Sequence, residues 1–104
     1  MEQHWITVSQ DRARSYVVVT GRLGLPQRDE LEHALQRVVA THPAALLVEL
    51  DVESLPDALV DTLADAIGAA TKAACQVRIG VLRPDLKERL DGDGRFPEVH
   101  LVEG

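Results

Sequence analysis

The sequence is short of cysteine, of long apolar runs and of positive charge. Cys75 is the only cysteine, which excludes an internal disulfide and a four-cysteine zinc site and fits a reducing compartment. The longest apolar runs fall far short of the roughly 20 residues that span a membrane. No basic segment followed by an apolar one marks a signal peptide. We therefore expect a cytoplasmic protein that does not insert directly into a membrane.

The charge balance also restricts the partners. Lys and Arg number 11 against 17 Asp and Glu, which gives a formal net charge of -6. Such a chain repels a phosphate backbone, so nucleic acid and anionic membranes are poor partners. Hydrophobic residues make up 45% and charged residues 27%, as in an ordinary globular protein. A chain of 104 residues can bury one core without a metal or a disulfide, and we expect a single domain over residues 1–104.

Strand-like segments alternate with helix-like segments along the chain. The strands are short runs rich in Val, Ile, Leu and Thr, and the helices place apolar residues at spacings of three and four. The predicted strands are residues 4–10, 15–21, 44–50, 75–82 and 98–103, and the predicted helices are residues 27–41, 56–72 and 84–90. This β-β-α-β-α-β-α-β order predicts an α/β fold, with helices packed on a mostly parallel sheet of about five strands.

Two of these strands carry further expectations. Residues 44–50 form a nearly continuous apolar run, typical of a strand that is buried on both faces, and we place it at the centre of the sheet. Residues 4–10 should form an edge strand that pairs antiparallel with the next strand. Such an edge leaves open a homodimer or pairing with another protein. Before the second helix, Ser54 and Asp57 stand three apart, as in a helix cap.

Residue patterns for catalysis or metal binding are absent from the sequence. The four histidines lie in four different predicted elements, without the four-residue helical spacing that brings two ligands to one metal: His4, His33, His42 and His100. No serine has a nucleophile-elbow setting and no glycine-rich segment matches a phosphate loop. Acidic residues 49, 51, 53 and 57 could attract a divalent cation, but their spacing matches no calcium loop. We expect no catalytic residue, metal or cofactor.

The predicted second helix carries an acidic stripe, formed by Asp57, Asp61 and Asp65 at intervals of four. Like charges at this spacing destabilise a helix by roughly 0.2–0.5 kcal/mol per pair. The helix dipole favours acids in the first turn, which accounts for Asp57 and in part for Asp61 but not for Asp65. With Asp51 and Glu53 just before it, the helix start would attract a basic partner. A binding surface and a solvated helix face both fit the stripe.

Three segments resemble the STAS domain family, which anti-sigma factor antagonists share with the tails of sulfate transporters: "VVVTGRLG", "LLVELDVESLPDALV" and "VLRPDLKERLDGDGRF". The first is similar to the family's strand that ends in Thr-Gly-x-Leu-Asp. The second is similar to its central signature, in which an acid closes a strand and an aspartate opens the next helix before Ser-Ser-Gly. Glu49 and Asp57 keep these two acidic positions. The resemblance implies a single-domain STAS-like fold.

The departures from the family pattern affect the expected function. In members that act as switches, a partner kinase phosphorylates the serine directly after the signature aspartate, and here that residue is Ala58. Leu59 and Val60 replace the following serine and glycine, and Gly24 replaces the aspartate of the Leu-Asp pair. A methyl group cannot accept a phosphate. The usual release of a partner by added negative charge is therefore not expected.

The resemblance implies a non-enzymatic module for signalling and transcription regulation, similar to an anti-sigma factor antagonist. Its partner would be an anti-sigma factor with an ATPase-like kinase fold or another STAS protein. The expected partner-binding residues come from one loop and one helix start: Leu23, Gly24, Leu25, Asp57, Ala58, Leu59, Val60 and Asp61. The alternative is a structural STAS subunit of a larger assembly or an accessory protein of a transporter, since a scaffold needs no phosphorylation switch.

Overall fold

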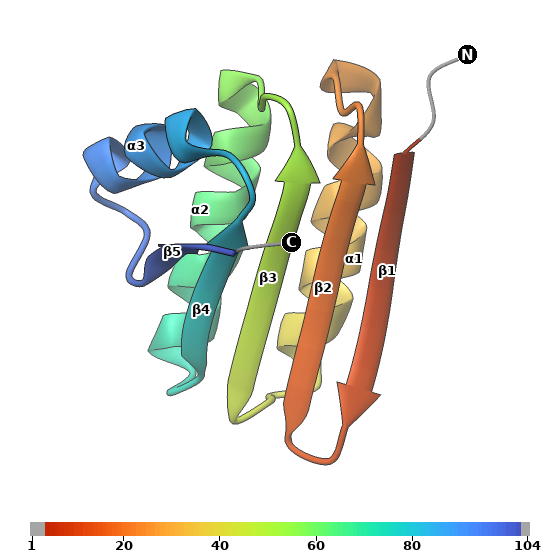
Figure 1. Cartoon of the computed structure of the whole chain (residues 1–104). Coiled ribbons are helices and arrows are strands. Elements are labelled where there is room, and N and C mark those ends of the chain that lie inside the picture. The colour runs from red at the N-terminus through yellow and green to blue at the C-terminus, as the bar shows by residue number, and fades with distance from the viewer. Residues whose placement is uncertain (1–3, 103–104) are drawn as a thin grey trace.

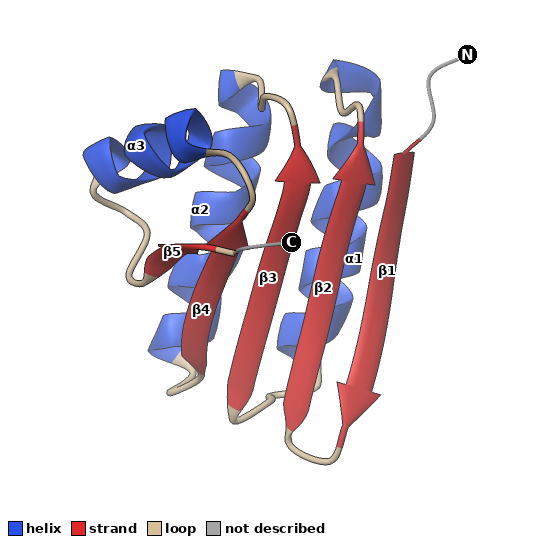
Figure 2. Cartoon of the chain, in the orientation of Figure 1, coloured by secondary structure: helices blue, strands red, loops and turns tan. Residues whose placement is uncertain are grey.

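The computed structural model describes residues 4–102, and of His4 only the backbone. Five strands and three helices follow one another in the predicted order, which confirms the α/β fold (Figures 1 and 2). A single turn of 3-10 helix, η1, precedes the first α-helix. The elements are β1 His4–Asp11, β2 Arg14–Gly21, η1 Leu25–Gln27, α1 Arg28–Ala40, β3 Ala45–Val52, α2 Asp57–Lys72, β4 Gln76–Val81, α3 Pro84–Asp93 and β5 Val99–Leu101.

The sheet has the strand order β1-β2-β3-β4-β5. β1 pairs antiparallel with β2, and the pairs β2–β3, β3–β4 and β4–β5 are all parallel. The prediction of a mostly parallel sheet, with the first strand at an edge and residues 44–50 at the centre, is confirmed.

The helices α1 and α2 cover only one face of this sheet (Figure 1, where both lie behind the strands). In β3 the residues on that face, such as Val48 and Leu50, are buried, whereas Leu47 and Glu49 on the other face are half-buried and Asp51 is exposed. The prediction that this strand is buried on both faces is wrong. The reason is topological, since each crossover from β2 to β5 moves one strand in the same direction. Right-handed crossovers of that kind place their helices on one side.

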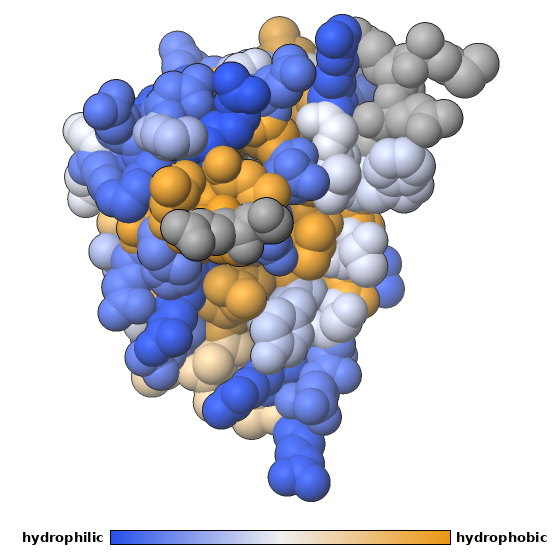
Figure 3. Space-filling view, viewed as in Figure 1, coloured by the Kyte–Doolittle hydropathy of each residue, from blue (hydrophilic) through white to orange (hydrophobic). Residues whose placement is uncertain are grey.

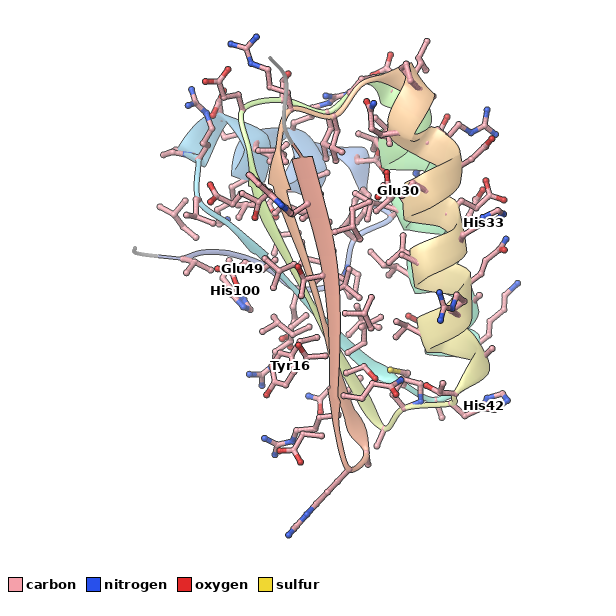
Figure 4. The ribbon with its side chains drawn as sticks, turned by 90° about the vertical axis from the view of Figure 1, so that its right-hand side faces the viewer. Tyr16, Glu30, His33, His42, Glu49 and His100 are labelled. Atoms are coloured by element: carbon pink, nitrogen blue, oxygen red, sulfur yellow. The ribbon has the colours of Figure 1, made fainter. Side chains whose placement is uncertain are left out.

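The core lies between the covered face of the sheet and the helices. Alternate residues of the strands meet the apolar stripes of α1 and α2 there. The largest side chains with less than 2% exposure are Leu31, Leu35, Leu46, Leu50, Leu55, Leu59, Leu63, Ile67, Ile79, Leu90, Val17 and Val19. The open face, seen in Figure 3, shows hydrophobic groups in its middle and hydrophilic groups around them. Figure 4 places Tyr16, Glu49 and His100 on this open side.

Two helix ends differ from the sequence-based expectation. α2 begins at Asp57 after Pro56, and no side chain caps it, so the expected cap from Ser54 and Asp57 is wrong. Pro56 takes the extended N-cap conformation by itself, with φ −59° and ψ 152°. α3 continues to Asp93, three residues past its predicted end, and stops where Gly94 adopts a left-handed φ of 85°. Glycine accepts this conformation without strain.

Candidate functional site

The loop after β2 and the segment that leads into α2 lie side by side at one end of the sheet. β2 and β3 are parallel neighbours, and their last residues, Gly21 and Val52, are in register. Their carboxyl ends therefore open onto the same edge, where ligands of open α/β sheets commonly bind. A hollow of about 390 Å³ lies there, lined by residues 21–24 and by Glu53 and Ser54. The structure thus places the predicted loop beside the segment that precedes the predicted helix start.

Short hydrogen bonds shape the loop Leu23–Leu25. The Gly24 N–H donates to the Gln27 side-chain oxygen at 2.6 Å, and the Gln27 N–H donates to the Gly24 carbonyl at 3.0 Å. Pro26 fixes its own φ at the start of η1. Leu25 is held at the tip with 63% of its surface exposed, the highest exposure among the exposed large hydrophobic side chains of the described residues. The loop therefore displays an apolar side chain on a closed turn.

The predicted partner-binding residues divide into a buried and an exposed group. Leu23, Leu59 and Val60 are 8%, 0% and 4% exposed, so their side chains belong to the core and support the surface without reaching a partner. The exposed group consists of Leu25, Asp57 and Asp61, with Gly24 and Ala58 half-buried beside them. A binding role for this exposed group stays a prediction.

Two arginines from the far end of the chain neutralise part of the acidic stripe. Arg89 on α3 donates to the Asp57 carboxylate and to the Leu55 carbonyl oxygen. Arg95, which follows α3, donates from Nη2 to Asp61 Oδ1 at 2.9 Å. Ion pairs between exposed groups add little stability, but they reduce the repulsion along the stripe. Both arginines lie in the third segment that resembles the STAS family, but the pattern of that segment does not indicate these contacts, which span more than 30 residues.

Asp65 differs from the other two aspartates of the stripe. It is exposed, and within residues 4–102 no cation pairs with it. It lines a groove of about 560 Å³ between α1 and α2, together with Ala58 and Asp61 from α2 and Arg28 and Glu32 from α1. The groove begins beside the α2 start and extends the candidate surface onto α1. No motif in the sequence indicates the residues of α1.

Arg95 also affects the ionisation of Asp93, the last residue of α3. Its Nε donates to Asp93 Oδ1 at 2.6 Å and its Nη2 to Asp93 Oδ2 at 2.9 Å. These hydrogen bonds lower the pKa of Asp93, and the bonds to Asp93 and Asp61 raise the pKa of Arg95.

The single cysteine, Cys75, is buried, and burial raises the pKa of its thiol. A raised pKa disfavours the reactive thiolate.

Within the described part of the chain, no three His, Cys, Asp or Glu residues form a group that could hold a metal ion. His33 and His42 lie on α1 and at its end, and His100 lies on the opposite side of the sheet (Figure 4). None of the helices in residues 4–102 is both long and apolar enough to cross a membrane.

No protein-family model and no curated protein matches the chain. Among solved structures, it is similar to the crystal structure of an anti-sigma factor antagonist from Mycobacterium paratuberculosis, with a TM-score of 0.80 and 24% identity. The match covers 98% of this chain and 87% of that chain. It confirms the fold that the resemblance predicted, over nearly the whole chain. At 24% identity this likeness shows the fold, but it does not show the partner or the binding site.

Proposed function

We propose that this chain is a regulatory protein-binding module of the anti-sigma factor antagonist type and that it catalyses no reaction. The observation that carries the proposal is the fold likeness to such an antagonist over 98% of the chain. The expected partner is an anti-sigma factor with an ATPase-like kinase fold, whereas another STAS protein would be the partner under the structural alternative. The expected place of action is the cytoplasm, whose reducing environment suits a chain with a free cysteine, Cys75.

The proposed contact surface combines an apolar anchor with a charged rim. Leu25 would be the anchor, because it is 63% exposed and held on a closed turn. Asp57 and Asp61, with side chains 98% and 64% exposed, would form the rim together with Asp65. Interfaces commonly surround a few apolar anchors with polar groups of this kind. The acidic rim favours a partner that presents lysine or arginine at this place.

This surface would act without a phosphorylation switch at its centre. By the resemblance to the family, Ala58 would occupy the place of the phosphorylated serine, and it has no hydroxyl. The nearest hydroxyl within the helix belongs to Thr62, which is 7% exposed and donates to the Ala58 carbonyl oxygen at 2.9 Å. A kinase would have to break that bond and unwind the turn to reach it. The proposed complex would therefore be regulated by the amount of either protein.

The test is affinity capture from native lysate of the source cells, with identification of the retained proteins by mass spectrometry. Wild type is compared with Asp57→Lys/Asp61→Lys, which reverses the charge of the surface. The matched control is Asp11→Lys/Glu98→Lys. It makes the same charge change elsewhere and also breaks one ion pair, since Glu98 pairs with Arg78 at 3.3 Å.

We expect wild type and the control to retain an ATPase-fold anti-sigma factor. The surface variant should bind the purified factor at least fivefold more weakly, equivalent to about 1 kcal/mol. Circular dichroism must show that both variants are folded. If all three baits retained the anti-sigma factor equally, the acidic stripe would not be part of the interface. Retention of transporter subunits or of other STAS proteins would favour the structural alternative, for which Ala58 is the supporting observation.

A further inference from the structure

The outer edge of β1 is unpaired in the described part of the chain. β1 pairs with β2 through eight consecutive residue pairs without a bulge, and no strand lies on its other side. Figure 4 looks onto this edge, with β1 nearest the viewer. Natural edge strands are usually blunted by proline, lysine, a bulge or shortness. Residues 5–10, "WITVSQ", carry no proline and no charge, whereas the opposite edge, β5, has only three residues.

This edge strand also exposes two large hydrophobic side chains, one on each face. Trp5 is 56% exposed and Val8 is 43% exposed. Val8 and Ile6 point to the helix side, where they line a groove of about 550 Å³ between β1 and α1. Trp5 points to the open face, in register with Thr20 of β2. Apolar groups that follow an unpaired backbone edge mark an interaction surface.

We propose that two copies of this chain pair through β1 into a symmetric dimer with one continuous ten-stranded sheet. An antiparallel pairing about a two-fold axis keeps the helices of both copies on the same side of the sheet. Residues that face each other across the new pairing must then have their side chains on the same face. Among such registers, the one centred on Thr7 matches the side chains best.

In this register Ile6 faces Val8 of the second copy, and Val8 faces Ile6 of the second copy. Trp5 faces Ser9 of the second copy, which is small and which pairs with Tyr16 within its own sheet. The indole would therefore reach across Ser9 to the exposed Tyr16 ring, a contact that aromatic side chains make readily. A register centred on Val8 would instead place Trp5 opposite Asp11 and Ile6 opposite Gln10. A register centred on Ile6 would place Val8 opposite His4. Apolar matching thus favours Thr7 over both of its neighbours as the centre.

The charges of α1 are complementary about the same axis. Gln10 donates to the Thr41 hydroxyl at 3.2 Å, which places these two residues at one level. Three strand residues back to Thr7 span about 10 Å, equal to about seven helix residues, so Ala34 lies level with Thr7. Glu30 and Arg37, which line the groove, flank this level on either side. In the two-fold dimer each Glu30 would lie near Arg37 of the other copy.

The first test is sedimentation of the full chain over a wide range of micromolar concentrations. We expect a monomer–dimer equilibrium whose dissociation constant rises at least tenfold in Val8→Lys. The two-fold axis would place a lysine opposite Ile6 at two positions of the dimer interface. The matched control is Leu101→Lys on β5, which changes a side chain of nearly equal exposure, 42%, and should leave the constant unchanged. Arg37→Glu should weaken the dimer, and Glu30→Arg/Arg37→Glu should restore it.

The register is tested by cross-linking of folded protein in a Cys75→Ala background. The two Thr7 Cα atoms would be about 5 Å apart, within the range of a disulfide, whereas the two Ser9 Cα atoms would be roughly 13 Å apart. Mild oxidation should therefore link the two copies of Thr7→Cys through a disulfide and leave the two copies of Ser9→Cys without a covalent link. A monomer at every concentration, a dimer that Val8→Lys does not weaken, or linkage through Ser9→Cys alone would overturn the proposal. None of these outcomes involves the Asp57 surface, so the proposed function is tested separately.

Discussion

A substitution at Gly80, on the open face of β4, tests how Val102 packs on the sheet. A Cβ atom at this position would lie 2.7 Å from Val102 Cγ2, well inside van der Waals contact. The Val102 N–H donates to the Val81 carbonyl oxygen at 2.7 Å, which holds Val102 over the glycine. In Gly80→Ala, the Val102 side chain must shift or this backbone hydrogen bond must stretch.

The expected effect follows from two opposing terms. Forcing an extra methyl group into a packed site costs about 1–3 kcal/mol. Replacing glycine by alanine within a strand returns about 0.5–1 kcal/mol of backbone entropy. The free energy of unfolding should therefore fall by up to about 2.5 kcal/mol in Gly80→Ala. The loss is bounded, because Val102 can detach locally from the sheet before the rest of the sheet unfolds.

Gly68→Ala is the matched control, since Gly68 lies within α2 and a Cβ there meets no atom within 4 Å. It should raise the free energy of unfolding by about 0.5–1 kcal/mol. Both values come from urea unfolding followed by circular dichroism, with an unchanged slope. Adding Val102→Ala removes the clashing atom, so Val102→Ala should cost less in the Gly80→Ala background than in wild type. A Gly80→Ala variant as stable as Gly68→Ala would refute the packing of Val102.

Two further changes test the core and the loop after α3. Leu59→Ala should lower the free energy of unfolding by about 2–5 kcal/mol, because Leu59 is 0% exposed, whereas Leu25→Ala at the loop tip should stay within about 0.5 kcal/mol of wild type; a small loss in Leu59→Ala would contradict its burial. Arg95→Gln should raise the pKa of Asp93 in an NMR titration, since Arg95 lowers it in the wild type. A lowered pKa in the folded state contributes stability above the unfolded pKa and loses it as the pH falls through the folded pKa. The variant should therefore lose less stability than wild type on acidification, and an unchanged Asp93 pKa would contradict the hydrogen bonds from Arg95 to Asp93.

The sequence predicted the order of elements because each strand and helix carries its own periodicity. It did not predict the open face, and Leu47 shows why. This side chain faces away from the helices, yet it is half-buried, with Tyr16 and Arg78 beside it on the neighbouring strands. Long neighbours thus shield an apolar residue without a second layer of helices. In the sequence such a residue resembles one that is buried on both faces.

The candidate site was predicted less completely, since its contacts join distant segments. The spacing of Asp57, Asp61 and Asp65 showed a common helix face, but periodicity carries no information about Arg89 and Arg95, which lie 32 and 34 residues from their partners. The acidic stripe therefore combines aspartates that pair with an arginine and one that does not, all at the same helical spacing. Asp57 and Asp61 pair with arginines of α3 and of the segment that follows it, whereas Asp65 is exposed and has no ion pair within residues 4–102.

The two proposed surfaces are compatible because they lie at different edges of the sheet. The candidate partner surface is at the carboxyl ends of β2 and β3, and the dimer would use the outer edge of β1. Antiparallel pairing makes the carboxyl ends of the two copies point in opposite directions. Both copies of Leu25 and Asp57 would then stay exposed at opposite ends of the dimer. A dimer of this form could hold two partners at once, and against an oligomeric partner its avidity would exceed the affinity of one site.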